Sequence, residues 1–185
     1  MESIKEETAV VLDLLPNGYP LEKQTGYKKT AIVQALGKEN FALLELVPKK
    51  DIRLASGDEV YIGSGKRDHI HHINGKLPIK KLTATAYGEL EFVIQKLVHD
   101  DEARFVAFFN KASPLSMRMH SLELLPGLGK KHMWEIVEER REPFTSFADI
   151  KTRVKLIQNP EKLIIKRILK ELEGEEKHKL FVKDV

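Results

Sequence analysis

The stretch that most constrains this chain is Pro126–Lys131, which lies between two apolar patterns of helical spacing at residues 115–124 and 130–140. Gly127 and Gly129 can adopt a positive φ, so they allow a tight connection between two helices. The first amides of the second helix have no intrahelical acceptor, and the helix dipole favours an anion there. We therefore predict that a phosphate binds here. It would contact the backbone at Gly127, Leu128, Gly129 and Lys130 and the charged side chains of Lys130 and Lys131.

This pattern resembles the hairpin of the helix-hairpin-helix family, in which apolar-Pro-Gly-apolar-Gly is followed by basic residues. The resemblance implies contact with a nucleic-acid backbone, independent of base sequence and mainly through hairpin amides. Met133 stands where the family usually has a small alanine, a departure that concerns helix packing and leaves the hairpin unchanged. The alternative is a glycine-rich connection between two packed helices, without a ligand.

Composition limits the classes of function. The chain has 185 residues, of which 42% are hydrophobic, which is enough for a real core. It has no cysteine, which excludes disulfides, thiolate metal sites and thiol nucleophiles and favours a reducing, intracellular location. The net charge is only +3, so a surface for nucleic acid must be a local patch. No apolar run approaches the ~18 residues of a membrane span, so we expect a cytoplasmic protein with no membrane partner; its oligomeric state is left open.

Short apolar segments separated by turn signals fill the first eighty residues. Asn74-Gly75 is a strong hairpin signal and predicts that 70–73 and 76–79 pair as two strands. About six short strands predict a small antiparallel barrel of OB type. Residues 1–7 are charged and are expected to form a mobile arm. The other expected strands are 8–15, 31–36, 41–47 and 57–63.

The segment 17–29 is a long predicted loop with an aromatic and basic composition. Tyr19 and Tyr27 are candidates for stacking on bases, and packing of the loop on the barrel is the alternative. The lysines near these rings are Lys23, Lys28 and Lys29.

Helical spacing replaces the strand pattern after Lys81. Thr83 or Thr85 is expected to cap a helix to about residue 98, and a second helix is expected at 101–111. Ser113-Pro114 predicts the start of the helix that ends at Leu124. The fold class is therefore α+β in two modules. Their boundaries are 1–81 for the barrel, 82–112 for connecting helices packed between the modules, and 113–185 for the helix-hairpin-helix domain.

A second, degenerate hairpin is predicted at 154–162, where Asn159 takes the left-handed conformation of a glycine. It would lie between a helix that starts at Ser146 and Asp149, read as a capping box, and a last helix that ends at Gly174. The charged tail Glu175–Val185 is expected to be frayed.

The whole chain also resembles a family. After the barrel come Leu82-Thr83, Ala86–Leu90, Arg104–Asn110, Leu122–Lys131 and Pro143–Ile150, and together these are similar to an archaeal family of uncharacterised, predicted RNA-binding proteins. The resemblance covers nearly all of residues 10–172. It implies nucleic-acid binding and names no reaction.

A second basic cluster lies between Ser64 and Lys81, with Asp68 as its one acid. Cations on neighbouring strands can follow a nucleic-acid backbone, whereas the alternative is a solvated edge strand protected by lysine. The members of this cluster are Lys66, Arg67, Lys76, Lys80 and Lys81.

The histidines at 69, 71 and 72 raise the question of a metal site. His69 and His71 share one strand face, and His72 is expected on the opposite face. Because no third ligand has recognisable spacing, we predict no metal and no cofactor.

An enzymatic alternative is a resemblance to helix-hairpin-helix DNA glycosylases, which carry a lysine just inside the second helix and an aspartate about twenty residues beyond the hairpin. Lys131 and Asp149 match those positions, and a lysine amine can form a Schiff base at an abasic sugar. Such enzymes need a pocket for a flipped base within a larger helical domain. We therefore predict a non-enzymatic protein that binds nucleic acid, with RNA favoured over DNA, and keep the glycosylase and a protein-interaction scaffold as alternatives.

Overall fold

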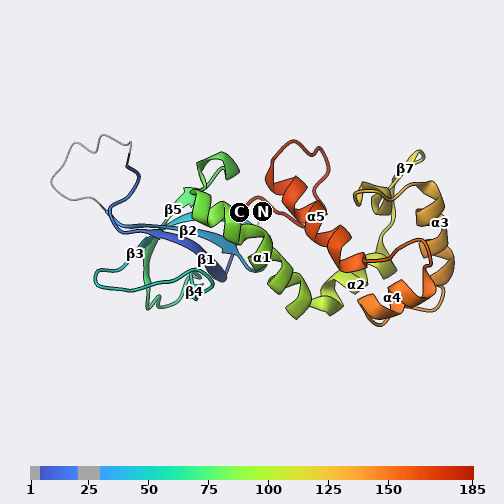
Figure 1. The fold of residues 1–185 in the computed structure, drawn as a ribbon, viewed down its shortest axis with the longest axis horizontal. Coiled ribbons are helices and arrows are strands. Elements are labelled where there is room, and N and C mark those ends of the chain that lie inside the picture. The colour runs from blue at the N-terminus through green and yellow to red at the C-terminus, as the bar shows by residue number, and fades with distance from the viewer. Residues whose placement is uncertain (1–4, 21–29) are drawn as a thin grey trace. The chain divides into compact units, whose positions relative to one another are not determined.

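The computed structural model describes residues 5–20 and 30–185 and has a mixed α+β fold (Figure 1). This confirms the predicted α+β class. The chain divides into two compact units: residues up to Val93 together with Leu172–Val185 form unit 1, and Ile94–Glu171 form unit 2. The predicted base-stacking Tyr27 and the lysines Lys23, Lys28 and Lys29 lie outside the described residues.

Unit 1 is built on a curled antiparallel sheet of five strands in the order β4-β1-β2-β3-β5. Alternating small and branched apolar residues, such as Val11, Val33 and Leu46, face a common core. β1 and β2 are buried along most of their length, so the sheet is covered on both faces there. The strands are β1 Thr8–Leu15, β2 Ile32–Gly37, β3 Leu43–Pro48, β4 Glu59–Tyr61 and β5 Ile70–Lys76.

The predicted hairpin at Asn74-Gly75 is wrong, because both residues lie inside the continuous strand β5. Gly75 pairs with Glu45 of β3, and the register shifts between Glu45 and Leu46. Gly75 has a φ of 151°, so the glycine serves a bulge rather than a turn. The expected strand at 76–79 is replaced by a short 3-10 helix, η1 Ile79–Lys81.

Both ends of the described chain are held in unit 1, against the expectation of a mobile arm and a frayed tail. Glu6 is 5% exposed, and its carboxylate accepts hydrogen bonds from the amides of Glu39, Asn40 and Ala42. At the other end, Phe181 and Val182 are buried, and the Lys183 amide donates to the Asn40 carbonyl at 3.1 Å. Charged segments therefore carry a few residues that anchor them to the loop at 38–42.

The junction between the sheet and the first helix is fixed by polar groups. The fully buried Gln34 side chain donates to the Lys81 carbonyl at 2.9 Å and accepts from the Thr83 amide at 2.9 Å. The Thr83 hydroxyl donates to Asp13 at 2.6 Å and accepts from the Ala86 amide at 3.0 Å. Thr83 thus caps α1 Ala84–Asp100, which confirms one of the two predicted caps.

Unit 2 is mainly helical, with a core of large apolar side chains that include Phe105, Phe109, Ile136 and Ile168. Its elements after α1 are α2 Glu102–Lys111, β6 Pro114–Ser116, β7 Met119–His120, η2 Ser121–Leu124, α3 Lys130–Glu139, α4 Phe147–Arg153 and α5 Pro160–Leu172. The 3-10 helix η2 and the helix α3 flank the Pro126–Lys131 stretch.

The predicted helix over 115–124 is wrong. A two-stranded hairpin, β6–β7, is followed there by the 3-10 helix η2. Leu115, Met117 and Met119 alternate along the chain and are exposed, so they offer no buried helical face. His120 and Glu123 then form a capping box that starts η2, with Glu123 accepting from the His120 amide at 2.8 Å.

The segment between α4 and α5 differs from the prediction in one conformational detail. Asn159 is not among the described residues with a positive φ. Instead its side-chain oxygen accepts from the Lys162 amide at 2.9 Å, which is the role of a helix cap ahead of Pro160. The Ser146 half of the predicted capping box is confirmed, because its hydroxyl accepts from the Asp149 amide at 3.0 Å, whereas the Asp149 carboxylate accepts from the Thr145 amide.

Candidate nucleic-acid interface

The connection into α3 turns at Gly127, which has a φ of +84°. An added Cβ at Gly127 would meet nothing within 4 Å, so the backbone conformation alone calls for glycine. The Leu128 amide donates to the Leu125 carbonyl at 3.1 Å, and the Leu128 side chain is buried. The predicted positive φ at Gly127 is therefore confirmed.

The second glycine of the stretch has an ordinary conformation. Gly129 has φ −99° and ψ −174° and is the N-cap of α3. Its amide donates to His132 Nδ1 at 3.1 Å, and the Met133 amide makes the first helical bond, to the Gly129 carbonyl. The amides of Leu128 and Gly129 are thus already engaged, which corrects the predicted donor set. The amides ahead of the first helical bond are those of Lys130, Lys131 and His132.

Lys130 and Lys131 are both exposed at this helix start. The backbone leading to them is anchored from α5, because Arg167 Nη1 donates to the Leu124 carbonyl at 3.0 Å. Arg167 is itself buried in an ion pair with Glu171 at 2.8 Å. The two exposed lysines therefore lie next to a turn whose backbone is held by the buried side chain of Arg167.

The loop that begins α3 faces the loop that precedes α5. A hollow of about 140 Å³ is lined by Gly127, Leu128 and His132 on one side and by residues 156–159 on the other. The segment 154–162, which was predicted as a second hairpin, therefore lies next to the Pro126–Lys131 stretch within unit 2.

A larger cleft lies between α3 and the β6–β7 hairpin, and the sequence analysis missed it. It has a volume of about 420 Å³. Lys130, Trp134 and Val137 line it from one face of α3, since residues four and three apart share a helix face. The opposite wall includes Met117 and Met119 of the hairpin, whose side chains are exposed. The sequence signal that could have indicated the hairpin wall of this cleft is the period-2 alternation of Leu115, Met117 and Met119.

The second predicted cluster belongs to unit 1 and is dispersed over three local structures. Lys66 is exposed and Arg67 donates to the Gly63 carbonyl at 2.9 Å, in the loop before β5. Lys76 at the end of β5 forms an ion pair with Asp184 at 2.9 Å. The exposed Lys80 and Lys81 are in η1. The cations therefore lie on no pair of neighbouring strands.

The predicted arrangement of the histidines is corrected by a bulge in β5. His72 pairs with Val47 and Ile70 pairs with Pro48, so His71 is the additional residue. The rings of His71 and His72 consequently meet, with Nδ1 atoms 2.8 Å apart, instead of facing opposite sides. Among the described residues, no group of three His, Asp or Glu side chains is placed to hold a metal ion.

Tyr19 is tied to the sheet rather than held out for stacking. Its hydroxyl donates to Glu45 at 2.6 Å and accepts from Gln34 at 3.2 Å. For Tyr19 itself, these bonds match the packing alternative.

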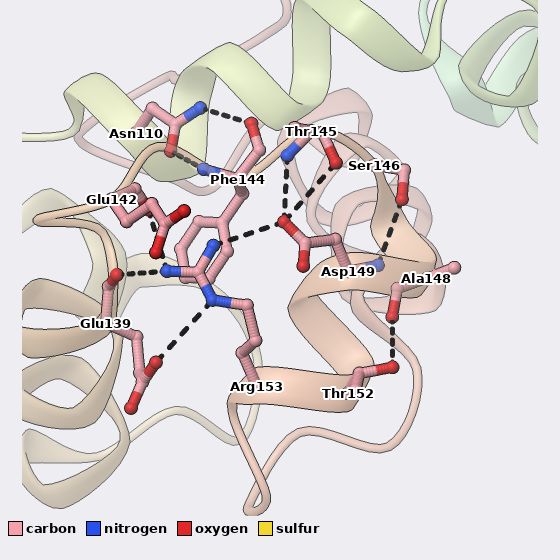
Figure 2. Close-up of polar contacts among 10 residues, drawn as sticks. All are labelled: Asn110, Glu139, Glu142, Phe144, Thr145, Ser146, Ala148, Asp149, Thr152 and Arg153. Carbon is pink, nitrogen blue, oxygen red and sulfur yellow. Dashed lines mark hydrogen bonds and ion pairs between the residues drawn. The ribbon is translucent and has the colours of Figure 1, made fainter.

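Asp149, the candidate of the enzymatic alternative, is engaged by its own neighbours (Figure 2). Its Oδ2 accepts from the Thr145 amide at 3.0 Å and from Arg153 Nη1 at 3.2 Å. The Thr145 amide, followed by Arg153, lowers the pKa of the Asp149 carboxyl, which favours the ionised form. Arg153 in turn stacks over the Phe144 ring, with its guanidinium carbon 4.6 Å from the ring centre. These contacts give Asp149 a structural role at the start of α4.

Comparison with known proteins places the chain among archaeal relatives. A family model described as "Protein of unknown function (DUF655)" matches residues 5–183. The uncharacterized protein MJ0038 of Methanocaldococcus jannaschii is 45% identical over 181 residues, which are 96% of this chain and 80% of that protein. The crystal structure of Af1531 from Archaeoglobus fulgidus is also 45% identical, with a TM-score of 0.87 over 96% of this chain and all of that one.

These descriptions name no ligand, so nucleic-acid binding stays a prediction. No helix in the part of the chain that the structure describes is long and apolar enough to cross a membrane. The match over nearly the whole length shows that the chain belongs to the DUF655 family.

Proposed function

We propose that this DUF655 protein binds nucleic acid through the backbone phosphates, without reading base sequence and without catalysing a reaction. The observation that carries the proposal is the start of α3. Two exposed lysines stand there beside three amides that precede the first helical hydrogen bond. A helix start of this kind attracts an anion, and full charges add to the partial charge of the helix dipole.

The rigid support of the turn favours a preformed site. Gly127 sets the chain direction with its positive φ, and Arg167 holds the preceding carbonyl of Leu124. The donors therefore need little ordering when a phosphate arrives, which lowers the entropic cost of binding. The local geometry of the turn thus supports phosphate binding like that of a helix-hairpin-helix motif, although a 3-10 helix takes the place of the first long helix.

We also assign a second, OB-like binding surface to unit 1. Lys66, Lys80 and Lys81 are exposed in that unit, whereas Lys76 and Arg67 are engaged by protein groups. We assign the unit a supporting role with single-stranded or structured RNA, as the family resemblance suggests. DNA contacts at α3 follow from the same phosphate chemistry, because neither the amides nor the lysines distinguish the two sugars.

A salt titration tests the proposal. Binding of labelled single- and double-stranded RNA and DNA of arbitrary sequence is followed by fluorescence anisotropy at several salt concentrations. Each neutralised phosphate contributes a slope of about −0.9 in log K against log salt on B-DNA. Lys130→Ala and Lys131→Ala are each expected to weaken binding and to flatten the slope by up to about one unit.

Lys166→Ala is the matched control, because Lys166 is an exposed lysine on α5 of the same unit. It is expected to bind like wild type. If both hairpin variants also bind like wild type, the turn has no phosphate role and the proposal fails. Borohydride trapping on abasic duplex addresses the enzymatic alternative: an adduct that disappears in Lys131→Ala would show a lyase instead.

A further inference from the structure

The cleft between α3 and the β6–β7 hairpin exposes an unusual amount of apolar surface. Trp134 is 64% exposed, Met119 39%, and Met117 is fully open. Trp134 and Met119 line a concave space of about 420 Å³, inside the range of about 300–1,000 Å³ of small-ligand sites. An exposed indole on a concave wall is a ready stacking surface for a flat ring.

The charges around this apolar wall favour an anionic ligand. Arg118, Lys130 and Arg140 line the cleft, and Glu123 is the one acid among the described residues that does so. Glu123 is already engaged by the His120 amide. The cleft is thus both apolar and cationic.

The side chain of Arg140 is a further reason to expect an anionic ligand in this cleft. Its Nη1 donates to the carbonyls of Phe109 and Ala112 at 3.1 and 2.7 Å. Among the described residues, no carboxylate forms an ion pair with it. The guanidinium is therefore fixed in place by neutral groups, and its charge remains available to a ligand.

The spacing along α3 matches a ligand with a flat ring and a phosphate. Trp134 follows Lys130 by four residues, so the two side chains lie on one face, about 6 Å apart along the helix axis. A nucleotide joins its base to its phosphate through one sugar, and both ends can meet this face together. In a duplex the base faces are already covered by stacking, so only an unpaired base can use the indole.

We propose that this cleft binds an unstacked base of a single-stranded nucleic acid, with the base on the Trp134 indole and its phosphate beside Lys130 and Arg118. The inference rests on the proposed function, which it deepens by assigning single strands to a particular site. An amphipathic protein helix could also cover the apolar wall, but the excess of cations favours a polyanion.

Trp134 is the single tryptophan of the chain, so its fluorescence reports on this cleft alone. The full-length protein is titrated with a short single-stranded RNA, with the same strand annealed to its complement, and with an abasic sugar–phosphate strand. The single strand is expected to quench Trp134 emission by stacking. The duplex and the abasic strand are expected to bind, as seen by anisotropy, with little quenching.

Variants separate stacking from phosphate contact. Trp134→Ala is expected to weaken single-strand binding by about 5- to 150-fold, the range for loss of one base–aromatic stack, and to leave duplex binding unchanged. Trp134→Phe should retain most of the affinity. Phe92→Ala is the control, since Phe92 is a 75% exposed aromatic on α1 that lies outside the cleft.

Two results would overturn the inference while the proposed function survives. One is single-strand binding that Trp134→Ala leaves unchanged. The other is a shift of Trp134 emission by an acidic amphipathic helical peptide, with no response to the single strand. Failure of the proposed function is distinct, because the wild-type protein would then show no anisotropy change with any nucleic acid.

Discussion

Replacing each glycine of the Pro126–Lys131 stretch by serine should have different effects on stability. Gly127 has a φ of +84°, a region that an L-residue enters at a cost. Gly129, two residues later, has a φ of −99° and caps α3. Gly127→Ser and Gly129→Ser therefore make the same chemical change in two different backbone conformations.

The structure sets the size of each effect. An added Cβ at Gly127 meets nothing within 4 Å, so the loss for Gly127→Ser is the backbone term alone, about 1–2 kcal/mol. At Gly129 the nearest atom to an added Cβ is His132 Nδ1 at 3.9 Å, an ordinary contact. Serine is a better N-cap than glycine by a few tenths of a kcal/mol, so Gly129→Ser should be neutral or slightly stabilising.

Urea unfolding followed by far-UV circular dichroism measures both variants against wild type. We expect a lower free energy of unfolding for Gly127→Ser only, with weaker binding to duplex because the lysines that follow are redirected. Equal stability of the two variants would refute the reasoning, since it would mean that the turn at Gly127 has no left-handed conformation in solution.

Two further predictions concern buried carboxylates. Burial, with a hydrogen bond to Glu39, raises the pKa of Glu6 to about 7, so the folded state holds a proton that the unfolded chain releases near pH 4.5. The free energy of unfolding should therefore fall by about 1–2 kcal/mol, after solvent screening, as the pH rises from about 5 to 8. Urea unfolding across this range should show the fall in wild type and in the control Glu7→Gln but not in Glu6→Gln. Glu171→Ala removes the carboxylate that pairs with the buried Arg167 at 2.8 Å. Thermal and urea unfolding should therefore show a loss of about 3–5 kcal/mol. The double variant Arg167→Met with Glu171→Leu should recover most of it, and an equal loss in the double variant would contradict this.

Local signals predicted the elements whose determinants lie close together in the sequence. Thr83 and Ser146 cap helices because each hydroxyl reaches an amide three residues later. Gly127 turns the chain because the constraint is its own φ. These features depend on a few neighbouring residues, and sequence reasoning recovers them.

Features that depend on distant partners were missed. Asn74-Gly75 looked like a hairpin, but β3 pairs with the whole of β5 and uses the glycine in a bulge. Glu6 looked like part of a solvated arm, but amides more than thirty residues away bind its carboxylate. The helix expected before Leu124 had a good cap signal, but Leu115, Met117 and Met119 are exposed in the folded chain, and tertiary packing decided against the helix.

The same distinction separates the candidate charges. A sequence gives the number and spacing of lysines and arginines, but it does not show which of them already bind other groups of the protein. Lys76 and Arg67 belong to one basic segment, and the fold engages them with Asp184 and the Gly63 carbonyl. Lys130 and Lys131 remain exposed at a helix start, where the helix dipole adds to their charge. Affinity for phosphate should therefore depend more on these two residues than on the larger cluster, although the larger cluster has the greater formal charge.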